Sequence, residues 1–143
     1  MGPNALADKV ARSMLAAEGT GPAWGIEIEE AREGYARIRM ALTADMLNGH
    51  GTAHGGMIFA LADTAFAYAC NSRNTRTVAA QASIVYLEPA REGDVLIAEA
   101  EEQALVGRSG VYRVAVRAHD GRAIAEFTGF SRSVGGAVIG ETE

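Results

Sequence analysis

The pattern of apolar and polar positions divides this chain into helices and strands. Near the beginning, Leu6, Val10 and Met14 recur at about one helical turn and predict an amphipathic helix over residues 4–18. The glycine- and proline-containing stretch at residues 19–22 is expected to end this helix. The first 20 residues are therefore interpreted as an N-terminal helix.

Strand patterns occur on both sides of the middle of the chain. Residues 26–42 predict two strands around Gly34, because Ile38, Met40 and Leu42 alternate with less apolar neighbours. The second half of the chain predicts four further strands separated by turn-forming residues. These strands cover residues 78–87, 95–103, 109–118 and 123–134.

The most apolar stretch lies between these two strand regions. Residues 55–71 are rich in alanine and contain no proline, which favours a helix. A helix that is apolar on nearly all sides must be covered, and a curved antiparallel sheet is the available cover. We therefore predict an α+β fold in which a long central helix is wrapped by a curved antiparallel sheet, as a single domain over residues 1–143.

Composition and charge narrow the functional classes. The net charge is -5 and no basic cluster occurs, which argues against nucleic acid or an anionic membrane as a partner. No apolar run is long enough to cross a bilayer. The single cysteine excludes an intrachain disulfide, and the chain does not begin like a secretory signal. A cytoplasmic location is expected.

Asp63 is the strongest chemical anomaly, since it is the only charged residue between Gly56 and Cys70. An unpaired carboxylate in apolar surroundings costs several kcal/mol, so it must face a cavity or a partner. The alternative is that Asp63 faces solvent, but its helical neighbours Phe59 and Phe66 offer no polar stripe. We therefore expect a carboxylate whose reactivity is set by apolar walls.

The glycine-rich stretch from Asn48 to Gly56 leads directly into this helix. Free amide groups at a helix start, assisted by the helix dipole, can stabilise a developing oxyanion, and Gly55 allows a substrate carbonyl to approach closely. Glycines at such junctions are also ordinary turn residues. The stretch lacks the Gly-Lys-Ser/Thr of a phosphate-binding loop and the glycine spacing of a dinucleotide fold.

Other arrangements of reactive residues are weaker. His50 and His54 are four residues apart, but Asp63 and Cys70 do not complete a recognisable zinc site, so no metal is expected. No Gly-x-Ser-x-Gly motif supports a serine triad. Cys70 is interpreted as a packed thiol. His54 is expected to hydrogen-bond the backbone and shape the loop.

Helix geometry separates the two strongest candidates. Gly55 and Asp63 are eight residues apart, which corresponds to about 12 Å along a helix. Both groups must lie within about 3 Å of one reacting centre. One helix cannot readily supply both, whereas two copies of the chain can. We therefore expect a homodimer with two equivalent active sites at its interface.

These residues carry a family resemblance. The stretch MLNGHGTAHGGMIFALADTAFAYACNS at residues 46–72, with EPAREGD at 88–94 and the closing GGAVIGE, resembles hotdog-fold acyl-CoA thioesterases of the phenylacetate-degradation (PaaI-type) family. The resemblance implies hydrolysis of aryl-acetyl-CoA or related acyl-CoA thioesters. It further implies a homodimer paired into a homotetramer and no organic cofactor or metal.

The resemblance also implies roles for individual residues. Asp63 would attack the thioester or activate water, and the Gly55 amide would polarise the thioester carbonyl. Asn48 would lie near the acyl group or the water, and Thr64 would be a hydrogen-bond partner of Asp63. His54 would shape the loop.

The sequence says less about which residues would bind the coenzyme A part and the acyl part of the substrate than about the reacting groups. The phosphates of coenzyme A need basic residues at the rim of the site, for which Arg73, Arg76 and Arg108 are candidates, although exposed arginines commonly serve solubility alone. Apolar residues are available for the acyl group but are equally expected as core; they are Met46, Leu47, Phe59 and Phe66.

Two departures from the family pattern concern acyl preference. Met57 stands where relatives often carry glutamine, and Ala53 stands where they often carry cysteine. Two other functions stay open: a non-catalytic acyl-CoA-binding module and a 3-hydroxyacyl thioester dehydratase. A binder gains nothing from Asp63. A dehydratase needs a histidine as proton shuttle, a role for which only His54 is placed.

Overall fold

The predicted helices and strands occur in the structure in the order in which the sequence patterns place them. The computed structural model describes residues 1–140, and residues 141–143 of the predicted domain lie outside this range, together with the last residue of GGAVIGE. Helices α1 (Pro3–Ala17), α2 (Thr20–Trp24) and α3 (Gly55–Cys70) and a short 3-10 turn at Ala44–Met46 accompany six strands. The strands are β1 (Glu27–Arg32), β2 (Tyr35–Ala41), β3 (Thr77–Tyr86), β4 (Val95–Val106), β5 (Ser109–Ala118) and β6 (Ala123–Ser133).

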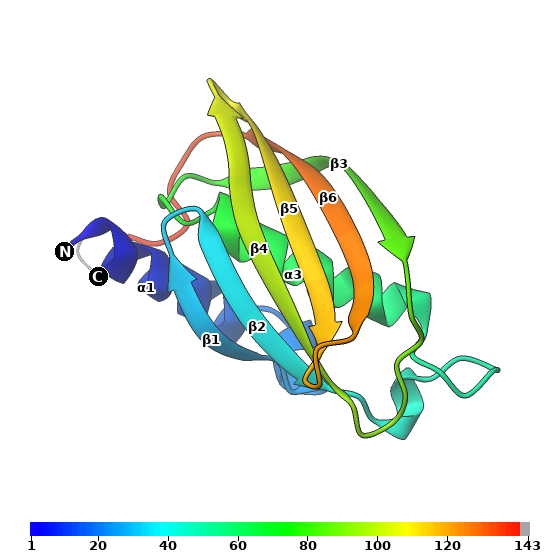
Figure 1. Cartoon of the computed structure of the whole chain (residues 1–143). Helices are drawn as coiled ribbons and strands as arrows, with labels where there is room; N and C mark the ends of the chain where they lie inside the picture. The colour runs from blue at the N-terminus through cyan, green and yellow to red at the C-terminus, as the bar shows by residue number, and fades with distance from the viewer. Residues whose placement is uncertain (141–143) are drawn as a thin grey trace.

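The six strands form one antiparallel sheet in the order β1-β2-β4-β5-β6-β3, curved around α3 (Figure 1). The predicted α+β fold with a wrapped central helix is confirmed. The alternation in β2 is confirmed as well, since Ile38 and Met40 are fully buried while Arg37 and Arg39 are partly exposed. Gly34 makes the β1–β2 turn with a φ of +71°, a conformation that glycine adopts without strain.

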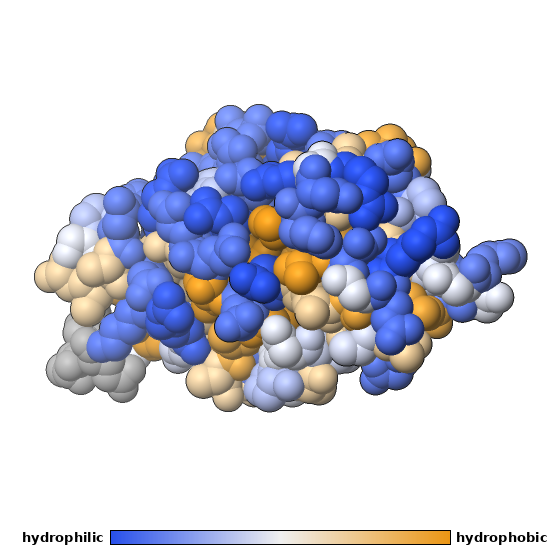
Figure 2. Space-filling view, turned by 60° about the horizontal axis from the view of Figure 1, so that its bottom comes forward, coloured by the Kyte–Doolittle hydropathy of each residue, from blue (hydrophilic) through white to orange (hydrophobic). Residues whose placement is uncertain are grey.

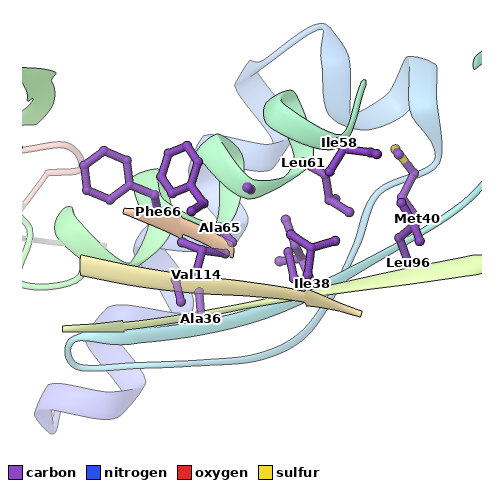
Figure 3. Close-up of a cluster of buried hydrophobic side chains, with 14 of the residues drawn as sticks. Ala36, Ile38, Met40, Ile58, Leu61, Ala65, Phe66, Leu96 and Val114 are labelled. Carbon is purple, nitrogen blue, oxygen red and sulfur yellow. The ribbon is translucent and has the colours of Figure 1, made fainter. Parts of the chain in front are cut away.

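The core lies between α3 and the sheet. Side chains of α3 such as Ile58 and Leu61 meet residues of β2, β4 and β5 (Figure 3). Farther along the helix, the ring of Phe66 packs 5.5 Å from Tyr112 and 5.8 Å from Phe127, measured between ring centroids. The approach requires Gly129 in β6, because a Cβ atom there would lie 2.8 Å from the Phe66 ring. The central helix is therefore fixed at its middle by close packing.

The structure differs from the sequence expectation after α1. Residues 19–22 do end the first helix, but a second short helix, α2, begins at Thr20. Pro22 is accommodated because it lies in the first turn, where backbone N–H groups have no partner within the helix. Strand β4 also continues past the predicted residue 103, because its pairing with β5 extends to Val106 and Ser109.

The two edges of the sheet differ in their cover. Helix α1 packs along β1, whereas β3 pairs with β6 on one side and has no strand on the other within residues 1–140. Val85 and Tyr86 on β3 are 59% and 50% exposed. Apolar residues also lie among polar ones on the face turned toward the viewer in Figure 2. An open, partly apolar edge strand is a surface on which another chain can pair.

Candidate active site

The loop before α3 is organised by Asn48. Its Oδ1 accepts hydrogen bonds from the amides of His50 at 2.9 Å and Thr52 at 3.2 Å. Its Nδ2 donates to the Thr52 hydroxyl at 3.1 Å, and its own amide donates to the Thr52 carbonyl at 2.8 Å. The short side chain therefore closes the loop on itself, as asparagine commonly does in turns.

His54 is the N-cap residue of α3. Its Nδ1 accepts a hydrogen bond from the Gly56 amide at 2.8 Å. Its carbonyl oxygen accepts hydrogen bonds from the amides of Met57 at 2.9 Å and Ile58 at 3.2 Å. The structure thus agrees with the expectation that His54 hydrogen-bonds the backbone and shapes the loop.

The hydrogen bonds around His54 leave one amide free at the helix start. The first four N–H groups of a helix have no acceptor in the preceding turn. In α3 these belong to His54, Gly55, Gly56 and Met57. The His54 amide donates to the Met46 carbonyl, and the amides of Gly56 and Met57 both donate to His54. Among residues 1–140, the Gly55 N–H has no acceptor. It lies at the positive end of the helix dipole, where a free N–H group can stabilise a developing negative charge.

The residues around this amide form a cavity of about 330 Å³. Asn48 and Gly55, both expected at the site from the sequence, line it together with Tyr86 from the end of β3. Sequence reasoning missed Tyr86, whose hydroxyl donates a hydrogen bond to the Gly55 carbonyl at 2.8 Å. The contact joins residues 31 positions apart, which no local pattern reveals.

Asp63 lies two turns farther along α3 and does not line that cavity. Its side chain is half-buried, and within residues 1–140 it makes no hydrogen bond or ion pair. Burial raises the pKa of its carboxyl group above the ordinary value. One chain therefore does not bring Gly55 and Asp63 to a single cavity, which agrees with the separation calculated from helix geometry.

The Thr64 hydroxyl does not form a hydrogen bond with Asp63 within this chain. Its hydroxyl donates to the Ala60 carbonyl at 2.7 Å, one turn earlier in the same helix. A hydroxyl has one proton to donate, so it is not available to Asp63 in this conformation. The expected hydrogen bond between Thr64 and Asp63 is therefore absent.

A second cavity, also of about 330 Å³, lies at the other end of α3. Cys70 lines it, and burial raises the pKa of its thiol to about 12, which fits a packed thiol rather than a nucleophile. Arg73 and Arg108 are at the same cavity. Arg76 lies at a separate depression beside α1.

The three arginines expected near coenzyme A differ in their partners. The Arg73 guanidinium is held by Glu33 at 2.9 Å and Glu102 at 2.7 Å, so its charge is already compensated. Arg108 is exposed and has no ion pair among the described residues. Sequence reasoning could not separate them, because Glu33 and Glu102 come from distant parts of the chain.

The remaining expected residues are mostly part of the core. Met46 and Phe66 are buried, at 5% and 1% exposure, while Phe59 packs at its edge 5.3 Å from Phe127. Ala53 is buried and Met57 packs against the core. Within residues 1–140, no three side chains that could bind a metal ion lie in one cluster. None of the helices in this part of the chain combines the length and the apolar character that a membrane span requires.

Comparison with known proteins places these features in a family. Residues 50–125, which contain Gly55, Asp63 and Tyr86, match the thioesterase superfamily. This chain belongs to the thioesterase superfamily. The sequence is 41% identical over 131 residues to the acyl-coenzyme A thioesterase PaaI of Escherichia coli K12, covering 92% of this chain and 94% of that protein. The resemblance to PaaI-type thioesterases is confirmed.

Solved structures agree with this assignment of the family and of the hotdog fold. The E. coli PaaI protein from the phenylacetic acid degradation operon superposes with a TM-score of 0.93 at 39% identity, over 95% of this chain and 99% of that chain. A hypothetical thioesterase protein from Streptococcus pneumoniae TIGR4, solved with coenzyme A, matches with a TM-score of 0.76 at 28% identity, over 78% of this chain and 90% of that chain.

Proposed function

We propose that this protein hydrolyses acyl-coenzyme A thioesters to the free acid and coenzyme A. The observation that carries the proposal is the free Gly55 amide at the start of a helix whose middle holds the unpaired carboxylate of Asp63. The acyl-coenzyme A thioesterase activity named for the E. coli relative supports it. The E. coli PaaI protein comes from a phenylacetic acid degradation operon, which favours an aryl-acetyl group as the acyl part of the substrate.

The chemistry requires a nucleophile and a site for negative charge. The Asp63 carboxylate either attacks the thioester carbonyl or takes a proton from the water that attacks it. In both cases the carbonyl oxygen becomes an oxyanion, which the Gly55 N–H stabilises. When the oxyanion collapses, the C–S bond breaks and the sulfur of coenzyme A takes up a proton, from the protonated Asp63 in the general-base route or from water in the nucleophilic route. In the nucleophilic route, water then hydrolyses the anhydride formed with Asp63, which releases the free acid and restores the carboxylate. The raised pKa of Asp63 makes it a stronger base than an exposed aspartate.

We infer that each active site is shared between two chains. The Gly55 cavity of one chain would face Asp63 of its partner, which explains why neither group has a partner within its own chain. The open edge of β3 is the surface proposed for pairing, since it exposes unpaired backbone groups and apolar side chains. We also propose that two such dimers associate into a homotetramer.

Binding of coenzyme A is assigned first to Arg108, the arginine at the second cavity that carries no ion pair among residues 1–140. Arg76 and Arg73 are secondary candidates, and Arg73 would have to release Glu33 and Glu102. Substrate binding needs no metal or organic cofactor in this scheme. The single hotdog domain of residues 1–143 and a cytoplasmic location belong to the same proposal.

A panel of acyl-coenzyme A esters, followed by release of free thiol, tests this function. Release from aryl-acetyl or medium-chain substrates supports hydrolysis. Tight binding without thiol release would instead indicate a binding module, and formation of an enoyl product would indicate a dehydratase. Asp63→Asn should lower kcat by about 10²-fold or more while the fold and the dimer persist, as expected for loss of a general base or nucleophile.

A further inference from the structure

We propose that Tyr86 is a positioning residue that holds the Gly55 amide in the geometry needed for oxyanion stabilisation. The inference rests on the proposed function. It adds a residue for which no catalytic role was expected from the sequence, and it assigns to the end of β3 a part in the chemistry at the start of α3.

Tyr86 contacts Gly55 in two ways, through its hydroxyl and through its ring. The Tyr86 hydroxyl donates to the Gly55 carbonyl at 2.8 Å. The edge of the phenol ring lies against the Gly55 backbone, because a Cβ atom placed there would be 3.1 Å from both the Cζ and the hydroxyl oxygen of Tyr86. Within residues 1–140, no other side chain forms a hydrogen bond with Gly55.

Gly55 needs such a restraint. It is followed by Gly56, and two successive glycines give the backbone more freedom than any other pair of residues. His54 restrains both peptide units of Gly55 from within the same segment, because its carbonyl accepts the amides of Met57 and Ile58 and its Nδ1 accepts the Gly56 amide. Tyr86 adds a restraint that comes from another element, β3. The Gly55 carbonyl belongs to the peptide unit after Gly55, and the Gly55 N–H belongs to the unit before it. The hydrogen bond from Tyr86 holds the second unit against the end of β3, and together with the bonds of His54 it narrows the rotation between the two units.

The position of Tyr86 also couples the site to the proposed dimer interface. Tyr86 is the last residue of β3, the strand with the open edge, and it is 50% exposed in the single chain. Pairing of a second chain along β3 would restrict the movement of this strand end. The tyrosine would transmit that restriction to the helix start, so that the oxyanion donor is best ordered in the assembled enzyme.

Tyr86→Phe is the direct test, because it removes the hydroxyl and retains the ring. Loss of one neutral hydrogen bond predicts a fall in kcat of about five-fold with KM unchanged, since the oxyanion forms only in the transition state. Thermal stability should fall by no more than the loss of one hydrogen bond from a half-exposed residue allows, and the oligomeric state should stay as in the wild type. Tyr35→Phe, which removes a hydroxyl bonded to Glu99 on β4, is the matched control and should keep the wild-type kcat.

A double-mutant cycle with Gly55→Pro gives a readout that a structural role would not produce. If Tyr86 acts through the Gly55 N–H, Tyr86→Phe should have no further effect in a chain that lacks this N–H. An equal five-fold loss in both backgrounds, an unchanged kcat in the single variant, or a loss confined to KM would overturn the inference. An inactive wild-type protein would instead refute the proposed function.

Discussion

Replacement of Gly55 by proline tests the oxyanion donor because it deletes one N–H group and leaves the helix start possible. Proline is favoured at the first position of a helix, where its missing N–H is not used within the helix. The residue before proline must be extended, and His54 already has φ of -62° and ψ of 133°. The substitution therefore fits the backbone that the structure shows.

The size of the effect follows from the hydrogen bonds at the helix start. His54 already accepts the amides of Gly56, Met57 and Ile58, so no neighbouring N–H can replace the one that is lost. Removal of one oxyanion donor lowers kcat by about 10²–10³-fold, or about 2.7–4 kcal/mol of transition-state stabilisation. Gly55→Pro should fall in this range, with a much smaller change in KM.

The assay is thiol release from an aryl-acetyl-coenzyme A ester, with thermal unfolding measured in parallel. Gly55→Ala is the matched control, because it keeps the N–H and adds a Cβ atom that shifts Tyr86 by a few tenths of an ångström. Gly55→Ala should lose far less activity than Gly55→Pro. A folded Gly55→Pro protein with the kcat of Gly55→Ala would refute the assignment of this amide as oxyanion donor.

Three further predictions follow from Asp63, Gly129 and His54. The raised pKa of Asp63 means that its ionised form destabilises the fold, so Asp63→Asn should raise the Tm at neutral pH. This gain in Tm should vanish as the pH falls below 3.8, the ordinary pKa of an aspartate. Equal Tm values of the two proteins at neutral pH would contradict this prediction. Gly129→Ala places a methyl group 2.8 Å from the Phe66 ring and should cost about 1–3 kcal/mol in urea unfolding. His54→Ala removes the cap of α3 and should cost about 1 kcal/mol in the same measurement, with a loss of kcat; an unchanged unfolding midpoint would show that the cap contributes nothing.

The elements that build this site could be predicted from the sequence because their patterns are local. The alternation of Ile38, Met40 and Leu42 has period two, and the apolar run that begins at Gly55 is long and free of proline, so strand and helix were distinguished by spacing and composition. Asp63 stood out for the same reason, as a charge without polar neighbours on its helix.

The parts that were missed depend on contacts between distant residues. The hydrogen bond of Tyr86 to Gly55 requires the end of β3 to return beside the start of α3, and the ion pairs of Arg73 require Glu33 and Glu102 to meet at one end of the sheet. The hydrogen bond of Thr64 to the Ala60 carbonyl was not predicted either, because a threonine in a helix can bond the carbonyl one turn earlier instead of a neighbouring side chain, and the sequence does not show which partner is taken.

Mixing of two inactive variants tests the central claim that Gly55 of one chain works with Asp63 of another. Gly55→Pro and Asp63→Asn chains are refolded together in equal amounts and assayed for thiol release. Half of the dimers are then mixed, and each mixed dimer has one site with both native residues, so about a quarter of the wild-type activity should return. A mixture no more active than the separate variants would contradict the shared site.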